Sequence, residues 1–137
     1  MPQDIQRLTF HFKWLWLTLG VGLFVSIIYL SLTPKPPVTL SFSMGDKLGH
    51  LLAYCMLMGW FAQLYTVWFQ RVFLSIAFGL MGVTVEVLQA MGGHRFFEYN
   101  DMVANIIGVV VGWLLSRYLF PGLLFNIDKR LASKLGL

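Results

Sequence analysis

Long apolar runs constrain the fold of this chain more than any other feature. The run from Trp14 to Pro34 contains no charged residue, and about 20 helical residues suffice to cross the hydrocarbon core of a bilayer. Only 12% of all residues are charged, whereas soluble domains have about 25%. The whole chain, residues 1–137, is therefore expected to be one all-α integral membrane domain, a four-helix transmembrane bundle. The spans are predicted at residues 14–33, 47–69, 72–90 and 102–119.

The two ends of the chain are amphipathic. Residues 2–13 place Ile5, Leu8 and Phe12 at spacings of three and four, which is typical of a short helix at the membrane surface. A frayed terminus is the alternative. Residues 123–137 place leucines on one side and three basic residues mostly elsewhere. This tail is predicted to be an interfacial helix.

Basic residues are distributed unevenly between the two sides of the predicted bundle. With four spans, the termini and a short connection at Gln70-Arg71 share one side, which carries seven of the ten Lys and Arg residues. Cytoplasmic loops carry such an excess. We expect a multi-pass protein of the bacterial cytoplasmic (inner) membrane with both termini in the cytoplasm. The net charge of +4 does not indicate nucleic acid as a partner, because the charges flank apolar runs.

Polar residues recur at helical spacing in three of the predicted helices, so that they line one face of each. The predicted topology places these faces at one depth, near the extracytoplasmic surface. Glu86 lies inside an apolar run, and a carboxylate at membrane depth costs a few kcal/mol. An intramembrane ionisable residue therefore indicates function. The ligand-binding candidates are Asp46, Lys47, His50, Tyr54, Glu86, Gln89, Arg95, Asp101 and Asn105.

Structural roles also fit several of these residues. Asp46 and Asp101 precede predicted helices, where N-capping accounts for an aspartate. Gln89 could serve only to hydrogen-bond across helices. Gly108 and Gly112 favour close packing of the fourth predicted helix against the third.

Two further structural alternatives concern ion pairing. A His50–Glu86 or a Glu86–Arg95 pair would stabilise the buried charge without any ligand. His94 and Glu98 are expected to be solvated loop residues.

A metal site could be built from His50, Glu86 and one of Asp46 or Asp101, since zinc accepts these ligands. We expect no metal and no cofactor, because only one histidine lies at membrane depth. A nucleophile is not evident either: no serine or cysteine accompanies the polar residues, and Cys55 is expected in the core.

Several short motifs are spaced along the chain. They are SLTP (31–34), DKLGH (46–50) with Tyr54, EVLQ (86–89), Arg95 and DMVANIIGVVVG (101–112). Together they resemble the VanZ-like family, small membrane proteins named for a teicoplanin-resistance protein, over roughly residues 28–116. The resemblance implies a four-helix membrane protein, linked in some members to tolerance of glycopeptide antibiotics, which makes such an antibiotic a candidate partner.

Two classes of function follow from the polar residues. In a binding protein, Lys47 and Arg95 would hold the phosphate or carboxylate of a membrane lipid or lipid-linked cell-envelope molecule. In a membrane enzyme acting on a lipid head group, the catalytic candidates are His50 and Glu86, either of which could act as general base. We favour the binding protein. A proton-coupled carrier is less favoured because four helices leave little room unless the chain oligomerises, and the sequence leaves the oligomeric state open.

Overall fold

The structure is a computed structural model that describes residues 9–34, 44–93 and 96–137. All regular elements in these ranges are helical, which confirms the all-α part of the predicted fold class. A π-helical turn, Leu115–Leu119, continues the fourth helix. The α-helices are α1 (Lys13–Leu32), α2 (Gly45–Leu64), α3 (Trp68–Met91), α4 (Tyr99–Leu114) and α5 (Leu123–Lys134).

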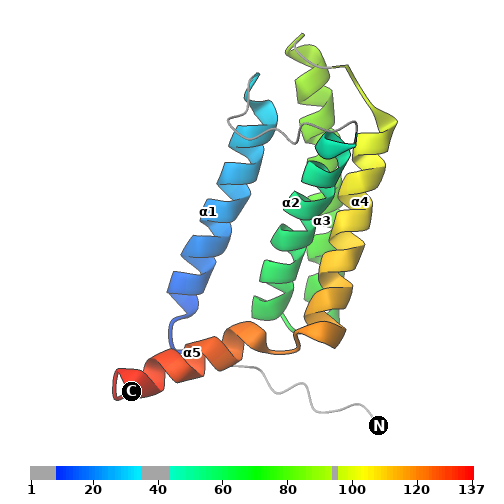
Figure 1. Cartoon of the computed structure of the whole chain (residues 1–137). Helices are drawn as coiled ribbons and strands as arrows, with labels where there is room; N and C mark the ends of the chain where they lie inside the picture. The colour runs from blue at the N-terminus through cyan, green and yellow to red at the C-terminus, as the bar shows by residue number, and fades with distance from the viewer. Residues whose placement is uncertain (1–8, 35–43, 94–95) are drawn as a thin grey trace.

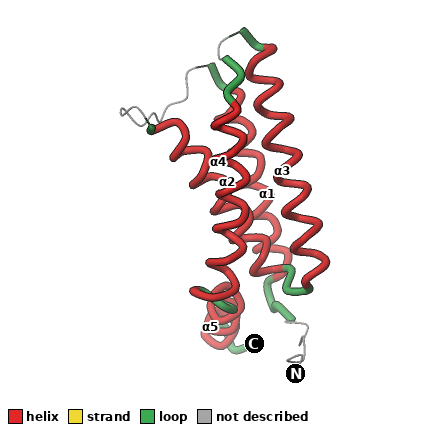
Figure 2. Tube along the Cα trace, turned by 90° about the vertical axis from the view of Figure 1, so that its right-hand side faces the viewer, coloured by secondary structure: helices red, strands yellow, loops and turns green. Residues whose placement is uncertain are grey.

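Helices α1 to α4 run up and down alternately, and α5 crosses one end of the bundle (Figure 1). In the view turned by 90°, α5 is seen nearly along its axis (Figure 2). The start of α1 and the whole of α5 therefore lie at the same end. The first turns of α2 and α4 lie at the opposite end, together with the last turns of α1 and α3.

Three of the described helical segments are long and apolar enough to cross a membrane. They are α1, α3, and α4 together with its π-helical turn. Although α2 has 20 residues, it is not among them, because Asp46, Lys47, His50 and Gln63 make it more polar. Length and composition thus support three spans in the described chain and not clearly the predicted four.

The second predicted helix is shorter than expected and the third begins earlier. Helix α2 ends at Leu64 and α3 already starts at Trp68, so the predicted connection at residues 70–71 is wrong. The reason is a side chain: the Arg71 guanidinium donates to the carbonyl oxygens of Ala62 (2.7 Å) and Tyr65 (3.1 Å). These carbonyls belong to the end of α2, where no helical N–H remains to bond them.

The predicted N-caps are also wrong. Met44 and Glu98 occupy the cap positions of α2 and α4, and neither side chain caps its helix. Asp46 lies two residues and Asp101 three residues after the cap residue, inside the first turns. There a carboxylate still interacts favourably with the helix dipole, which explains why the sequence signal was misplaced by a few residues.

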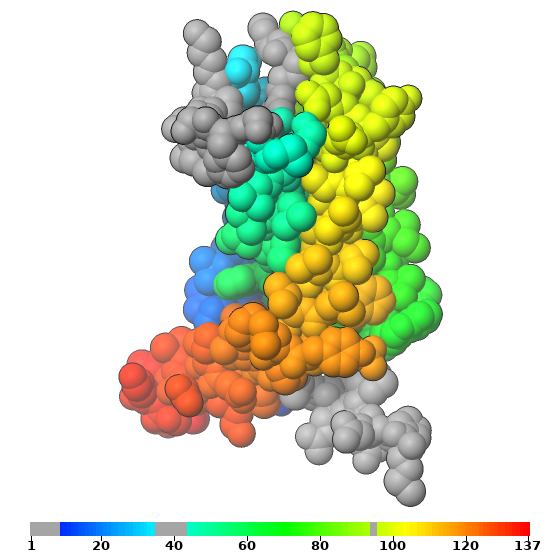
Figure 3. All heavy atoms as spheres, turned by 45° about the vertical axis from the view of Figure 1, so that its right-hand side comes forward, coloured from blue at the N-terminus to red at the C-terminus, as the bar shows by residue number. Residues whose placement is uncertain are grey.

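Glycine allows α4 to pack closely against α2. A Cβ atom on Gly108 would collide with the carbonyl oxygen of Leu51, and one on Gly112 with that of Cys55. The prediction that these glycines pack against the third helix is therefore wrong. Contacts between α2 and α4 are the most extensive in the bundle, and in the space-filling view the two helices touch along their length (Figure 3).

Helix α5 is fastened to the start of α1 by a buried aspartate that the sequence did not single out. Asp128 is 0% exposed and accepts hydrogen bonds from Trp16 Nε1 (2.7 Å) and from the backbone N–H groups of His11 (2.7 Å) and Phe12 (3.0 Å). Burial alone raises the pKa of Asp128, but these bonds outweigh it and lower the pKa below its ordinary value. Asp128 thus ties α5 to the backbone just before α1.

The predicted surface helix at residues 2–13 is only partly described. Residues 1–8 lie outside the described residues, and residues 9–12 are not helical. The tail helix ends at Lys134 rather than at the last residue.

Candidate functional site

Buried polar side chains gather at the end of the bundle opposite α5. They come from the first turns of α2 and α4 and from the last turns of α3 (Figure 1). Arg95 lies outside the described residues. Those with at most 8% of their surface exposed are His50, Tyr54, Glu86, Gln89, Asp101 and Asn105.

His50 joins α2 to α4. Its Nδ1 lies 3.0 Å from Oδ1 of Asn105, and because an amide oxygen only accepts, Nδ1 is the donor. Its Nε2 lies 3.7 Å from Oδ2 of Asp101. The ring is therefore held between an amide on one side and a carboxylate on the other, with Nε2 turned to the carboxylate.

Lys47 connects the cluster to the loop before α4. Its Nζ lies 2.7 Å from Oε2 of Glu98 and 3.5 Å from Oδ1 of Asp101. Glu98 was expected to be a solvated loop residue. Its side chain is 48% exposed, but it also forms this ion pair, so the prediction missed its role. Its position three residues before Asp101, at the start of the same helix, was the available signal.

Glu86 is 1% exposed. Its Oε1 accepts a hydrogen bond of 2.8 Å from the backbone N–H of Glu98, the residue at the N-cap position of α4. A helix N-terminus favours a carboxylate because its N–H groups lack helical partners. Among the described residues the partner of Glu86 is thus a backbone amide, while His50 pairs with Asn105 and Asp101.

Gln89 hydrogen-bonds across helices, which was the structural alternative to ligand binding. Its Nε2 donates to the carbonyl oxygen of Ser31 at 2.6 Å, in the last turn of α1, where carbonyls lack helical partners. Gln89 therefore ties α3 to α1. The face of α3 that carries Glu86 still approaches α4, because a Cβ on Gly82 would lie 2.9 Å from Nδ2 of Asn105.

Four atoms of this cluster, on three different helices, are buried and have no hydrogen-bond partner among the described residues. They are the Tyr54 hydroxyl, Oε2 of Glu86, Oε1 of Gln89 and Nδ2 of Asn105. Buried polar groups are nearly always bonded, and each one left unsatisfied costs about 1–3 kcal/mol. The cluster can therefore accept further polar groups, both as a donor and as an acceptor.

The side-chain atoms that could bind a metal ion do not form the set that the sequence analysis considered possible. Asp46, His50 and Asp101 each offer one ligand atom, and these atoms lie within 4.8 Å of one another. The predicted set combined His50 and Glu86 with only one aspartate. Because Asp46 and His50 are four residues apart, they project from the same face of α2 toward the first turn of α4.

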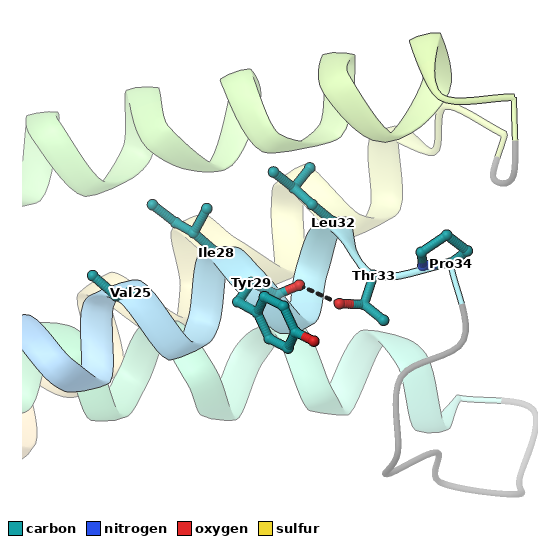
Figure 4. Close-up of a pocket in the computed structure, with 6 residues that line it drawn as sticks. All are labelled: Val25, Ile28, Tyr29, Leu32, Thr33 and Pro34. Carbon is teal, nitrogen blue, oxygen red and sulfur yellow. Dashed lines mark hydrogen bonds between the residues drawn. The ribbon is translucent and has the colours of Figure 1, made fainter.

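An apolar groove of about 600 Å³ runs along the last turns of α1, at the same end of the molecule as the cluster. Figure 4 shows its lining, with the Thr33 hydroxyl turned back to the Tyr29 carbonyl oxygen at 2.6 Å. The groove is lined by Val25, Ile28, Tyr29, Leu32, Thr33 and Pro34.

Comparison with known proteins agrees with the motifs. The model of the VanZ/LLP1 family matches residues 3–123, a range that contains α1 to α4 and every residue of the polar cluster. No curated protein and no solved structure matches the chain. Since the family model covers most of its length, this chain belongs to the VanZ/LLP1 family.

Proposed function

We propose that this protein holds a membrane lipid or lipid-linked cell-envelope molecule by its head group, in an extracytoplasmic-facing polar site within the membrane. The observation that supports this most is the set of buried atoms on Tyr54, Glu86 and Asn105 that have no hydrogen-bond partner among the described residues. A head group with hydroxyls, amides or a phosphate would supply such partners. Lys47 at the rim would attract its negative charge.

The distribution of basic residues supports the orientation that this proposal needs. At the α5 end, described bases stand at the helix termini and on α5 itself, whereas Lys47 is the one described Lys or Arg at the cluster end. Cytoplasmic surfaces carry the excess of Lys and Arg. In this arrangement α2 is the fourth span, shielded by α4, and both termini are cytoplasmic. The bases at the α5 end are Lys13, Arg71, Arg117, Lys129, Arg130 and Lys134.

The groove on α1 supports an amphiphilic ligand. It is almost entirely apolar and lies at the same end of the bundle as the polar cluster. The hydrogen bond from Gln89 to Ser31 joins α3 to α1, the helix that lines the groove. A lipid could place its head group among the polar side chains while an acyl chain follows α1. Some members of the family that the chain resembles are linked to tolerance of glycopeptide antibiotics. This link adds cell-envelope precursors to the candidate ligands, and a glycopeptide-tolerance phenotype to the expected consequences.

Native mass spectrometry of the full chain released from membranes tests the proposal. The wild type should retain lipid, and Glu86→Gln should lose most of it. Glutamine keeps the oxygen that accepts from the Glu98 amide but removes the charge, so the bundle should still fold. Asp128→Asn is the matched control, because it makes the same chemical change in another buried carboxylate at the opposite end.

Retention of the same lipid by wild type and Glu86→Gln would refute the proposal. Loss of lipid from Asp128→Asn as well as from Glu86→Gln would attribute the effect to bundle stability and would also count against a dedicated site.

Enzymatic action on a lipid head group is the second candidate. The position of His50 between Asn105 and Asp101 favours it, since a carboxylate beside a histidine stabilises the protonated ring during general base catalysis. Incubating the purified protein with bacterial lipid extract should then yield a new lipid product that His50→Gln does not make. Unchanged lipids after prolonged incubation with the wild type would favour the binding protein.

A further inference from the structure

We propose that Asp46, His50 and Asp101 form a binding site for a divalent metal ion, with Zn²⁺ as the expected occupant. Their ligand atoms lie within 4.8 Å of one another. Asp46 and His50 stand on successive turns of α2, and Asp101 stands in the first turn of α4. A metal here would join the two most extensively packed helices of the bundle at the mouth of the polar cluster.

His50 is oriented as a metal-binding histidine would be. Its Nδ1 donates to the Asn105 amide oxygen at 3.0 Å, which leaves the lone pair of Nε2 in the neutral ring facing Asp101. Metal-bound histidines usually donate their second ring nitrogen to such an acceptor, which fixes the tautomer and the ring orientation. Asn105 would thus be the residue that positions the ligand.

The spacing between Nε2 of His50 and Oδ2 of Asp101 is 3.7 Å. Ligands bound to tetrahedral zinc at about 2.0–2.1 Å lie about 3.3 Å apart. The observed pair is therefore close to the separation of two ligands on one ion. Asp46 is exposed, and it offers the third ligand atom, within 4.8 Å of the other two.

Charge also favours a cation at this place. The carboxylates of Asp46 and Glu86 are close enough to Asp101 to interact with it electrostatically, and Glu98 is joined to it through Lys47. Lys47 binds Oδ1 of Asp101, so Oδ2 is the oxygen that faces His50.

Tyr54 supplies an independent indication. It is 1% exposed, and its hydroxyl has no partner among the described residues. Helical side chains lean toward the helix N-terminus, so Tyr54, one turn after His50, is aimed at the turn that carries His50. Zinc sites with three protein ligands keep a fourth position open. The Tyr54 hydroxyl could bond a water or an anionic oxygen there. That this oxygen belongs to a lipid head group rests on the proposed function.

The experiment uses the full chain in detergent, stripped with a chelator and titrated with ZnCl₂ in a calorimeter. We expect one Zn²⁺ per chain. Asp46→Asn and His50→Gln should each weaken the affinity at least tenfold. Because Asp46 is exposed, Asp46→Asn should fold normally even if His50→Gln does not. Co²⁺ substituted into the wild type should show the visible absorption of a tetrahedral site, and Asp46→Asn should lose it.

His11→Gln and His94→Gln are the controls, since they remove the other two histidines of the chain and should leave the affinity unchanged. Absence of Zn²⁺ binding, or equal affinity in the wild type and Asp46→Asn, would overturn the proposal. The titration needs no lipid, so its failure is separate from that of the proposed function. Lipid retention without zinc binding would refute the metal site alone, and zinc binding without lipid retention would refute the lipid site alone.

Discussion

Three of the described carboxylates are almost wholly buried. Two of them, Asp128 and Glu86, lie at opposite ends of the bundle and differ in how their oxygens are bonded. Asp128 accepts three hydrogen bonds, from Trp16, His11 and Phe12. Glu86 accepts one on Oε1, and its Oε2 has no hydrogen-bond partner among the described residues. A fully bonded buried carboxylate is explained by the fold alone. A buried carboxylate with one oxygen that lacks a hydrogen-bond partner can still bind a ligand. For this reason we place the proposed site at Glu86.

Asp128→Asn should lower the free energy of unfolding at neutral pH by about 2 kcal/mol, because hydrogen bonds to a charged group are lost or weakened. The pKa of Asp128 is lowered in the folded protein. Its contribution is therefore complete above the unfolded pKa of about 3.9 and is lost as the pH falls through the folded pKa. Melting curves of wild type and variant should differ at pH 7 and converge in strong acid. A difference that grows on acidification would contradict this role.

At the scale of the elements, the pairing of α2 with α4 decides where the polar residues meet. Both helices start at the cluster end, so His50 faces Asn105 and Lys47 faces Asp101. About one and two turns after Asn105, Gly108 and Gly112 have no side chain, which lets the backbones of α2 and α4 approach each other. Without that approach, a bond between His50 and Asn105 would be too long to form.

Gly108→Ala should destabilise the bundle by about 1–3 kcal/mol, because the new methyl group would overlap the Leu51 carbonyl and force α2 and α4 apart. Gly79→Ala is the matched control: it is also helical, nothing lies within 4 Å of its added Cβ, and alanine favours helix. Thermal unfolding in detergent should show a loss for the first variant and no loss for the second. Equal melting temperatures would contradict the close approach.

At the scale of the whole molecule, the proposed orientation in the membrane rests on the distribution of basic residues between the two ends of the bundle. The α5 end carries six of the described Lys and Arg residues, and the cluster end carries Lys47. The α5 end also presents a helix lying across the bundle (Figure 1). Basic side chains on α5 would be attracted to anionic lipid of the cytoplasmic leaflet.

Cysteine labelling in intact cells tests this orientation. In a Cys55→Ala background, a cysteine at Phe96, which is 92% exposed, should react with an impermeant thiol reagent added outside. A cysteine at the exposed Ser133 should react only after the cells are opened. The reverse pattern would place the polar site on the cytoplasmic side and would exclude its extracytoplasmic function.

Apolar run length and helical periodicity were enough to predict an all-helical membrane protein, and to place polar faces on residues 46–54, 86–89 and 101–105. Both are local properties that depend on spacing along one helix. The sequence motifs also indicated the family, which the family model confirms. Helix boundaries were less accurate, because Arg71 ends α2 from a neighbouring helix.

Partnerships between helices were decided only in the tertiary structure. Periodicity shows which face of a helix is polar but not which helix that face meets. The sequence therefore assigned Gly108 to the wrong neighbour and gave no sign that Asp128 binds the backbone just before α1. It left a His50–Glu86 pair and a Glu86–Arg95 pair as alternatives, whereas in the structure the Glu86 carboxylate accepts from the Glu98 amide. Each of these contacts joins segments far apart in the chain. Such contacts depend on how close the packed backbones come, and here the glycines of α4 set that distance.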